Sequence, residues 1–581
     1  MGDRTQFVPS HGSYDDNVLP ANPLFTRLLT LAHRAERRPA IRDVHAGIEK
    51  DVAELLSDAL NLRRVLKSHL TPDTIQDLHD GNEVYISVTA PGGYEFAVAI
   101  LAVLALGAAA SPFSTVQPVE EAKYYVTKAR SVAVLAATQA LELGKAVEKE
   151  IQSTTDKHFV CVPINSYATF PPVPTSEILI SSNQYVDPNG PGIVIFTSGT
   201  TGPPKGAILR RAAITDGAMC FAEQLGLQHT DTLLHLLPVH HATGIWVSFF
   251  PFLQSGACIE FRPGNFSPQW TWDRFKRGGL THFSGVPTIY MRMMRHYQEH
   301  LNKLPSSALS AYRSGAAQIR TCICGTSALP KPIDDFWTQL RNGQRIVQRY
   351  GSTETGVVFN MPFSANTAIP DGSVGTATLG VDVKLAGSSD EGEVLMRSFN
   401  MFSKYLHDPI ATKNAHTPEG YFKTGDIARK EGDYYFIIGR ASVDIIKSGG
   451  YKISALDIER EILALPYAGE AMVVGVPDDE FGQRVAAVVS LRNDEVAQEF
   501  YREHGRSAAS LRLEELRADV RTRLAGYKMP TLLRVVQGEL PKSATGKVVK
   551  KTLGPKYFPE DYVNDAEVQV WRNDRARDTK L

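Results

Sequence analysis

Short runs of apolar residues alternate with helical patterns along the N-terminal part of this 581-residue chain. The runs occupy residues 83–90, 131–137, 192–198, 231–238, 257–263, 319–325 and 345–351. Continuous apolar strands separated by helices are typical of a parallel sheet that is covered on both faces. The pattern therefore predicts an α/β fold with a large N-terminal domain of packed, mostly parallel sheets and helices.

The longest apolar run extends from Phe96 to Ala110. It is shorter than the roughly 20 residues that a membrane span needs, so we expect one buried core helix. An amphipathic pattern at 24–39 predicts the first helix of the domain. Because this segment is rich in arginine, a transit peptide is the alternative interpretation. Cys322 and Cys324 lie on an apolar stretch and are expected in a buried strand, because a zinc site needs further ligand pairs at set spacing.

The pattern of apolar and polar residues changes twice in the C-terminal third. From about residue 372, alternating residues and glycine turns predict a small β-rich subdomain that continues to 439. A helix at 455–464 and strands at 471–477, 485–491 and 532–537 then indicate a compact α+β unit. We therefore predict an N-terminal domain at 1–439, a hinge at 440–444, and a small mobile C-terminal domain at 445–581.

Composition narrows the class of partner. Apolar residues make up 43% and charged residues 22%, and the net charge is -1 without a basic or acidic block. This argues against nucleic acid as the main partner, and the five scattered cysteines predict no disulfide framework.

The default expectation is a cytoplasmic protein with no membrane span. The tail Thr579-Lys580-Leu581 differs by one residue from the peroxisomal Ser-Lys-Leu address, which keeps a peroxisomal alternative open. The oligomeric state is left open.

Residues 197–206 read TSGTTGPPKG and follow the apolar run 193–196 directly. Glycines allow close backbone approach to a ligand, and hydroxyls with free N–H groups at a loop between a strand and a helix suit phosphate. Lys205 adds a positive charge. The spacing is not that of the Walker motif, because no Ser or Thr follows the lysine. The residues alone predict a phosphate-handling loop, with a flexible surface turn as the alternative.

This segment resembles the AMP-binding signature of the adenylate-forming superfamily, which includes acyl-CoA synthetases, luciferase and the adenylation domains of peptide synthetases. Further motifs follow in the family's order: LPVHHATG at 237–244, GTSALP at 325–330, RYGSTETG at 349–356, YFKTGD at 421–426 and PKSATGKV at 541–548. The resemblance covers nearly the whole chain. It implies ATP, Mg²⁺ and CoA as cofactor and co-substrates, and a small carboxylic acid as substrate. The implied nucleotide-binding residues are Thr197, Ser198, Gly199, Thr200, Thr201, Gly202, Lys205, Gly325, Thr326, Ser327, Tyr350, Gly351, Ser352, Asp426 and Arg440.

Individual roles are carried over from the family in the same way. Tyr350 would stack on adenine, Thr353 would bond the α-phosphate, and Glu354 would hold Mg²⁺. Asp426 would accept hydrogen bonds from the ribose hydroxyls, with Arg440 as a second contact. The implied catalytic residues are Lys547, Thr353 and His241, and His241 would also line the acyl and CoA tunnel. The implied CoA-binding loop comprises Ser448, Gly449, Gly450, Tyr451 and Lys452.

The stretches 442–462, 473–489 and 285–294 look most like malonyl-CoA synthetases, including the mitochondrial acyl-CoA synthetase family member that activates malonate. Arg292 is the matching candidate for binding the distal carboxylate, because a guanidinium fork pairs with a carboxylate through two hydrogen bonds. The chain departs from these relatives at Ala242-Thr243 and at Ser352, where smaller, more polar residues leave room for a larger polyacid. We predict an acid–thiol ligase for a short di- or polycarboxylic acid, in a pathway to a specialised metabolite.

Three alternatives stay open at this point. The substrate could be a medium-chain or aromatic acid. The acceptor could be a carrier-protein thiol, or the acyl group could be oxidised as luciferase does, although no carrier domain is fused to the chain. In a different class, the chain could be an inactive nucleotide-binding protein, since fold does not guarantee activity. The presence of Lys547, Glu354 and Asp426 argues against that last interpretation.

Overall fold

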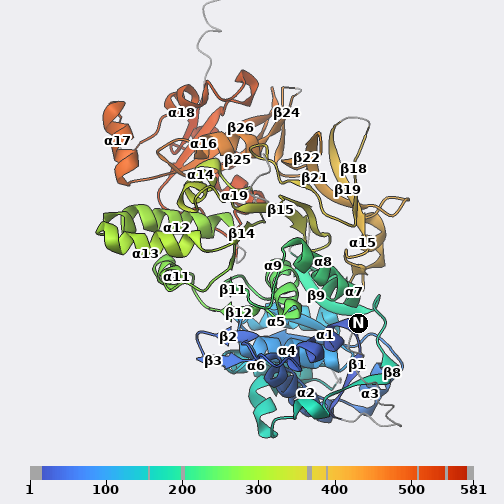
Figure 1. Ribbon diagram of the computed structural model, residues 1–581. Coiled ribbons are helices and arrows are strands. Elements are labelled where there is room, and N and C mark those ends of the chain that lie inside the picture. Colours follow the sequence, from blue (N-terminus) through green and yellow to red (C-terminus); the bar gives the residue numbers. More distant parts are fainter. Residues whose placement is uncertain are drawn as a thin grey trace, which may run out of the picture.

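The structure is a computed structural model. It describes residues 16–571 except 155–157, 198–202, 327, 363–368, 388–389, 450, 507–509 and 544–546, and the side chain of Lys452 also lies outside the description. Figure 1 shows the C-terminal residues, in orange and red, at one end of the molecule and the N-terminal residues, in blue, at the other. The confirmed fold class is α/β, with large sheets in the N-terminal part and a smaller α+β unit at the C-terminus.

A seven-stranded sheet has the order β20-β10-β9-β5-β4-β6-β7. The neighbours β9-β5, β5-β4, β4-β6 and β6-β7 pair in parallel, as predicted. The strands are β4 (Tyr85–Thr89), β5 (Ala109–Phe113), β6 (Ala133–Ala136), β7 (Val160–Pro163), β9 (Pro191–Thr197), β10 (Lys205–Arg210) and β20 (Lys404–Tyr405). The helices are α2 (Val52–His69), α3 (Pro72–His79), α4 (Tyr94–Ala105), α5 (Val119–Ala129) and α6 (Leu141–Thr154).

A nine-stranded sheet has the order β17-β16-β15-β14-β13-β11-β12-β2-β3. Its strands are β2 (Ile41–Asp43), β3 (Ile48–Lys50), β11 (Thr232–His235), β12 (Cys258–Phe261), β13 (His282–Gly285), β14 (Thr321–Cys324), β15 (Val347–Ser352), β16 (Gly356–Asn360) and β17 (Thr376–Ala377). One face packs on α11 (Pro268–Lys276), α12 (Pro287–Glu299), α13 (Ser306–Ala317) and α14 (Lys331–Leu340), with Trp272 stacked on Trp337. Cys322 and Cys324 are buried in β14, as predicted.

The remaining N-terminal helices and strands join these sheets. They are β1 (Val18–Ala21), α1 (Pro23–Ala32), β8 (Leu179–Tyr185), α7 (Arg211–Ile214), α8 (Asp216–Gln224), α9 (Ala242–Gly244) and α10 (Phe250–Ser255). An antiparallel four-stranded sheet follows, in the order β18-β19-β21-β22. It consists of β18 (Val381–Leu385), β19 (Glu391–Ser398), β21 (Phe422–Glu431) and β22 (Tyr434–Arg440), with α15 (Pro409–Asn414) beside it.

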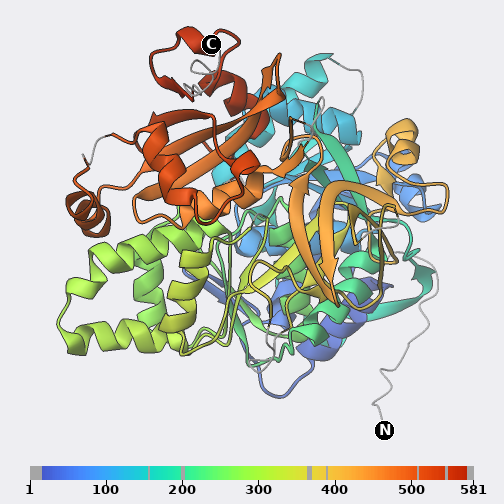
Figure 2. The same cartoon turned by 90° about the horizontal axis from the view of Figure 1, so that it is seen from above.

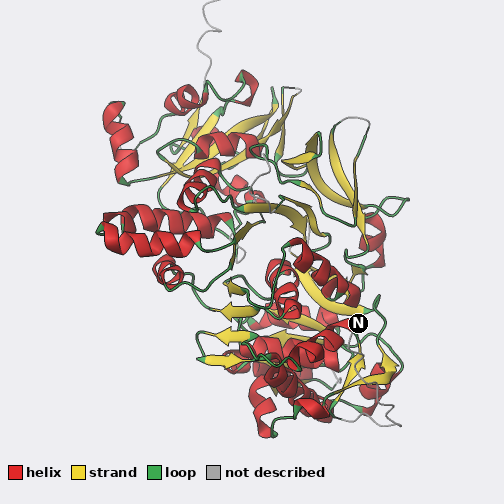
Figure 3. Ribbon diagram, in the orientation of Figure 1, coloured by secondary structure: helices red, strands yellow, loops and turns green. Residues whose placement is uncertain are grey.

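The C-terminal unit has hydrophobic clusters of its own on both faces of a four-stranded sheet. Figure 3 shows this sheet as yellow arrows among red helices. Its strands are β25 (Ala468–Asp478), β26 (Gly482–Leu491), β27 (Leu532–Val536) and β28 (Val568–Val570), preceded by the hairpin β23 (Ile445–Ser448) and β24 (Tyr451–Ser454). The helices are α16 (Ala455–Leu463), α17 (Glu495–Glu503), α18 (Leu513–Val520) and α19 (Lys550–Tyr557).

Two predicted helices are present but end earlier than expected, and one loop prediction was wrong. The apolar run from Phe96 is a helix only to Ala105; Gly107 turns the chain at φ 88°, and β5 begins at Ala109. The helix expected at 24–39 ends at Ala32. The glycine-rich segment joins two antiparallel strands, β9 and β10, and not a strand to a helix, because residues 205–210 form an apolar strand. Within the described residues, no helix combines the length and the apolar character of a membrane span.

Candidate active site

Tyr350, Asp426 and Arg440 form a hydrogen-bonded group at the junction of the nine-stranded and four-stranded sheets. The β21–β22 hairpin pairs Asp426 with Arg440 in register, and β15 supplies Tyr350. The Tyr350 hydroxyl donates to Asp426 Oδ2 over 2.7 Å, and Arg440 Nε donates to Asp426 Oδ1 over 2.8 Å. Burial lowers the pKa of Arg440, but the attraction of Asp426 outweighs it, so the net shift is upward. The group presents a fixed carboxylate and a guanidinium side by side.

Glu354 lies in the turn after β15 and is held by two neutral hydroxyl groups. Tyr405 donates to Glu354 Oε1 over 2.9 Å, and Ser352 donates to Oε2 over 3.0 Å. Lys205 Nζ lies 5.2 Å from the centre of the Tyr405 ring, so the base of the glycine-rich segment adjoins this carboxylate. The Ser352 hydroxyl, predicted to contact substrate, is directed at Glu354 instead of an open pocket. Thr353 lies between these residues and is half-buried.

Lys547, from the C-terminal unit, lies near Glu354, Asp426 and Arg440. Partial desolvation and Arg440 lower the pKa of its ammonium, while Asp426 and Glu354 raise it. Lys547 is exposed to solvent, so it lies at the solvent-facing edge of the cluster. The structure therefore brings together the predicted lysine, the predicted Mg²⁺ carboxylate and the predicted ribose carboxylate from distant parts of the chain.

His241 faces this lysine from the N-terminal domain. Burial, and secondarily Lys547, lower the pKa of His241 to about 4, so the imidazole is neutral at pH 7. Its Nε2 atom is buried and has no hydrogen-bond partner in the described part of the chain. By contrast, the buried His235 contacts the Gly244 carbonyl at 2.9 Å and shapes the same turn. Nδ1 of His235 is also buried without a partner among the described residues, so what distinguishes His241 is its position beside Lys547, which is consistent with its predicted ligand-facing role.

The backbone of the predicted adenine loop is unusual at Thr326, which has φ 77°. A β-branched residue in this region is a conformational outlier, and such strain concentrates at functional sites. Gly351 in the neighbouring strand cannot carry a side chain, because a Cβ atom there would lie 1.8 Å from the Gly356 carbonyl oxygen. The strained Thr326 and the side-chain-free Gly351 both belong to motifs that the resemblance assigns to the nucleotide site.

Arg349 was not singled out from the sequence. Its side chain lies on the same face of the sheet as Gly325, over the ring of Phe221 at 5.8 Å, and the residue is only 8% exposed. Burial lowers its pKa to about 10, offset in part by Cys324 and Tyr290. Its Nη1 atom has no hydrogen-bond partner within the described residues. One signal could have found it: an arginine directly before Tyr350, inside the family's RYGSTETG motif.

Other predicted residues lie away from the cluster. Arg292 on α12 is half-exposed, and its Nε lies 3.8 Å from Glu539 of the C-terminal unit. The predicted CoA loop contacts its own domain: Gly449 N–H donates to the Phe481 carbonyl, and Tyr451 stacks on Tyr527 at 4.3 Å. Residues 198–202, 327, 450 and the side chain of Lys452 fall outside the described residues.

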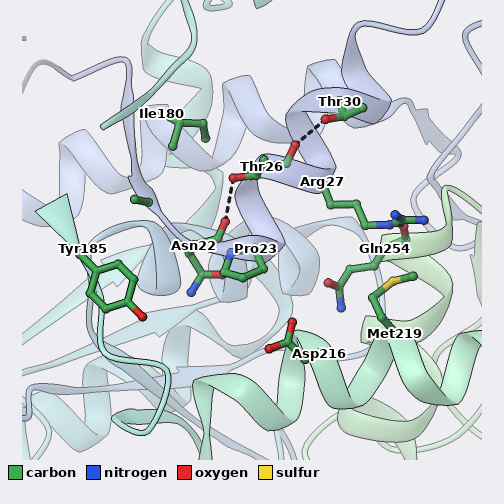
Figure 4. A pocket seen from close by; sticks show the side chains of 11 residues that line it. Asn22, Pro23, Thr26, Arg27, Thr30, Ile180, Tyr185, Asp216, Met219 and Gln254 are labelled. Carbon is green, nitrogen blue, oxygen red and sulfur yellow. Dashed lines mark hydrogen bonds between the residues drawn. The ribbon is translucent and has the colours of Figure 1, made fainter. Parts of the chain in front are cut away.

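A shallow groove of about 640 Å³ lies elsewhere, between α1, β8 and α8 (Figure 4). Its polar groups already serve the fold: Asn22 caps α1, Thr26 donates to the Asn22 carbonyl, and Arg27 donates to the Gln254 carbonyl over 2.6 Å. It contains none of the predicted site residues. We therefore locate the chemistry at the Lys547 cluster and not in this groove.

The donor set at Glu354 fits a magnesium ion. Mg²⁺ is usually held by one or two carboxylates together with phosphate oxygens and water. Glu354 is a carboxylate bonded to hydroxyl groups, and no cluster of three or more His, Cys, Asp or Glu side chains occurs among the residues described. A single protein carboxylate beside a nucleotide site is the arrangement that this ion prefers.

Comparison with known sequences identifies the family. Residues 33–406 match the model of the AMP-binding enzyme family, and residues 457–547 match that of the AMP-binding enzyme C-terminal domain. The chain belongs to the AMP-binding enzyme family. It is 30% identical to the acyl-CoA ligase oryP of Aspergillus oryzae, over 97% of this chain and 96% of that protein.

Two further comparisons cover most of the chain. It is 31% identical to the mitochondrial malonate–CoA ligase ACSF3 of Homo sapiens, over 92% of each. It superposes on the ATP-bound MatB structure from Rhodopseudomonas palustris with a TM-score of 0.76 at 24% identity, covering 93% of this chain and all of the other, which shows a shared fold. The predicted family is confirmed, and so are the ligase class and the use of ATP, Mg²⁺ and CoA that belong to it.

Proposed function

We propose that this chain activates a short di- or polycarboxylic acid such as malonate, as an ATP-dependent acyl-CoA ligase in a pathway to a specialised metabolite. One observation carries the reaction class: Lys547 of the C-terminal unit lies near enough to Glu354, Asp426 and Arg440 for their charges to shift its pKa. The malonate–CoA ligase activity of the human relative supports the choice of acid. The compartment stays a prediction, because Thr579 to Leu581 lie outside the described residues.

In the first half-reaction, an oxygen of the substrate carboxylate attacks the α-phosphorus of ATP, and pyrophosphate leaves with the electron pair of the broken P–O bond. Lys547 stabilises the charge that develops on the α-phosphate and carboxylate, and Asp426 holds the ribose. Glu354 would hold a Mg²⁺ ion, which would supply positive charge against the phosphate oxygens. Positioning and electrostatics suffice, because phosphoryl transfer needs little covalent help from the protein.

In the second half-reaction, the CoA sulfur attacks the acyl carbonyl carbon, AMP leaves, and the thiol proton passes to solvent. We propose that the C-terminal unit rotates about residues 440–444 between the two halves. Asp444 accepts from the Arg440 N–H over 3.0 Å and pairs with Lys550 at 2.6 Å, so the segment is braced in the present orientation. Rotation would exchange Lys547 for the loop at 448–452.

Arg349 is our candidate for binding the second carboxylate of the substrate. A buried cation with an unpartnered nitrogen gains strongly from an anion placed against it. The burial of Arg349 against Gly325 of the predicted adenine loop supports this assignment, whereas Arg292 faces Glu539. Arg292 remains the candidate predicted from the sequence, and the two arginines are separable by mutation.

The test measures CoA-thioester formation with acetate, malonate, methylmalonate, succinate, tricarballylate, octanoate and 4-coumarate. We expect a preference for a diacid, and Arg349→Met should reduce kcat/KM for that acid by about 30-fold or more, the lower end of the loss of a buried charge pair. Arg349→Lys, which keeps the charge, should lose less, and Arg277→Met on the exposed end of α11 is the control. Equal losses for acetate and malonate would contradict the role of Arg349; a preference for octanoate or 4-coumarate would contradict the proposed substrate.

A further inference from the structure

Helix α12 lies directly against the C-terminal unit, and Figures 1 and 2 show the green helices beside the orange and red elements in both views. Arg295 Nη2 donates to the Gly469 carbonyl of β25 over 3.0 Å. One turn earlier, Arg292 faces Glu539, and one turn later, Gln298 accepts from Arg492 over 3.5 Å. One face of a single helix therefore makes three contacts across the domain boundary.

These contacts reach the base of the segment that carries Lys547. Glu470, the neighbour of Gly469 in β25, is only 7% exposed. Its carboxylate accepts from the Leu540 N–H over 2.7 Å and pairs with Lys542 at 2.6 Å. Glu539 also pairs with Lys542, at 3.2 Å. Arg292 is thus linked to the start of the 541–548 segment through Glu539, and Arg295 contacts the backbone next to Glu470, which holds the same segment.

Gly469 leaves room for the contact between Arg295 and strand β25. A Cβ atom at Gly469 would lie 3.3 Å from Arg295 Nη2 and 3.1 Å from the Ser490 carbonyl oxygen. The absence of a side chain lets the guanidinium approach the backbone of β25. At its other end, α12 follows β13, the neighbour of the strand β14 that leads into the Thr326 loop. The helix therefore links the nucleotide-site sheet to the segment that carries the lysine.

We propose that Arg295 and Arg292 are positioning residues that hold the C-terminal unit in the orientation presenting Lys547 for adenylation. This inference rests on the proposed ligase function. An interaction made only in this orientation raises the population of the adenylating state at the expense of the thioester-forming state. The two half-reactions should therefore respond differently when the contacts are removed.

The experiment measures each half-reaction separately. Acid-dependent ATP–pyrophosphate exchange reports adenylation, and CoA-thioester formation from supplied malonyl-AMP reports the second half. Arg295→Gln should slow exchange by tenfold or more and should not slow the second half. Arg277→Gln, an exposed arginine outside the boundary, is the matched control. Thermal unfolding of each variant shows whether the fold is retained.

Arg292 is tested by a cycle with Glu539. If the two act through each other, Arg292→Ala, Glu539→Ala and the double variant should slow exchange to a similar extent, for malonate and octanoate alike. Multiplicative losses, or a loss with Arg292→Ala that is confined to malonate, would overturn the pairing in favour of a substrate-binding role. Equal losses in both half-reactions for Arg295→Gln would overturn the positioning role. Inactivity of the wild-type chain in both assays would instead contradict the proposed function.

Discussion

Replacing Lys547 with alanine removes one positive charge from a cluster that contains Glu354, Asp426 and Arg440. With the lysine, two carboxylates face two cations; without it, the cluster carries an excess negative charge towards an anionic substrate and ATP. A unit charge 4 Å from a phosphate oxygen is worth about 4 kcal/mol at an effective dielectric constant of 20. Because Lys547 lies at the solvent-facing edge of the cluster, we discount this to about 3 kcal/mol, or roughly 100-fold in rate.

The assay compares the half-reactions again. Lys547→Ala should lower acid-dependent ATP–pyrophosphate exchange by about 100-fold, while thioester formation from supplied acyl-AMP stays near the wild-type rate. Lys551→Ala, an exposed lysine on α19, should change neither. Exchange by Lys547→Ala at the wild-type rate, in a folded protein, would refute the assignment of the lysine to the adenylating site.

Three further predictions follow from single contacts. Asp426→Asn should raise KM for ATP by roughly 10- to 100-fold, because charge-assisted bonds worth about 1.5–3 kcal/mol are lost; an unchanged KM would contradict the ribose role. Thr326→Gly should relieve the strain at φ 77° and raise the free energy of unfolding by about 1 kcal/mol, and urea titration showing destabilisation would contradict this. Burial lowers the pKa of His235 to about 4. The unfolded chain therefore binds the proton first, and up to about 3 kcal/mol of stability should be lost as pH falls from 6.5 to 4. His235→Gln should flatten that pH dependence in urea unfolding, and an unchanged slope would contradict it.

The strands and the motif residues were predictable because each has a local signal. Apolar runs of strand length gave β4, β9, β14 and β15 close to their observed bounds, and the family's motifs named Tyr350, Asp426 and Lys547 individually. The helix from Phe96 was predicted, but its end was misjudged because buried helix and buried strand are equally apolar, so periodicity cannot separate them. A single glycine, Gly107, divides the two elements in the structure.

The arrangement of the site was not predictable from local signals. The approach of Lys547 to Glu354 depends on how two domains pack, and the burial of Arg349 depends on Phe221 in a helix far along the chain. The same holds for Arg292. Its motif position indicated a substrate ligand, whereas the packing of α12 directs it at Glu539. Charged residues at a domain boundary carry no sequence signature that separates them from pocket residues.

The central claim is that this cluster adenylates a diacid, and malonate-dependent ATP–pyrophosphate exchange tests it most directly. Purified wild-type protein is incubated with ATP, Mg²⁺ and labelled pyrophosphate, without CoA, and with each acid of the panel in turn. The account predicts exchange that requires Mg²⁺, is fastest with malonate or another short polyacid, and is lost in Lys547→Ala. No exchange with any acid, by a folded protein that binds ATP, would contradict it.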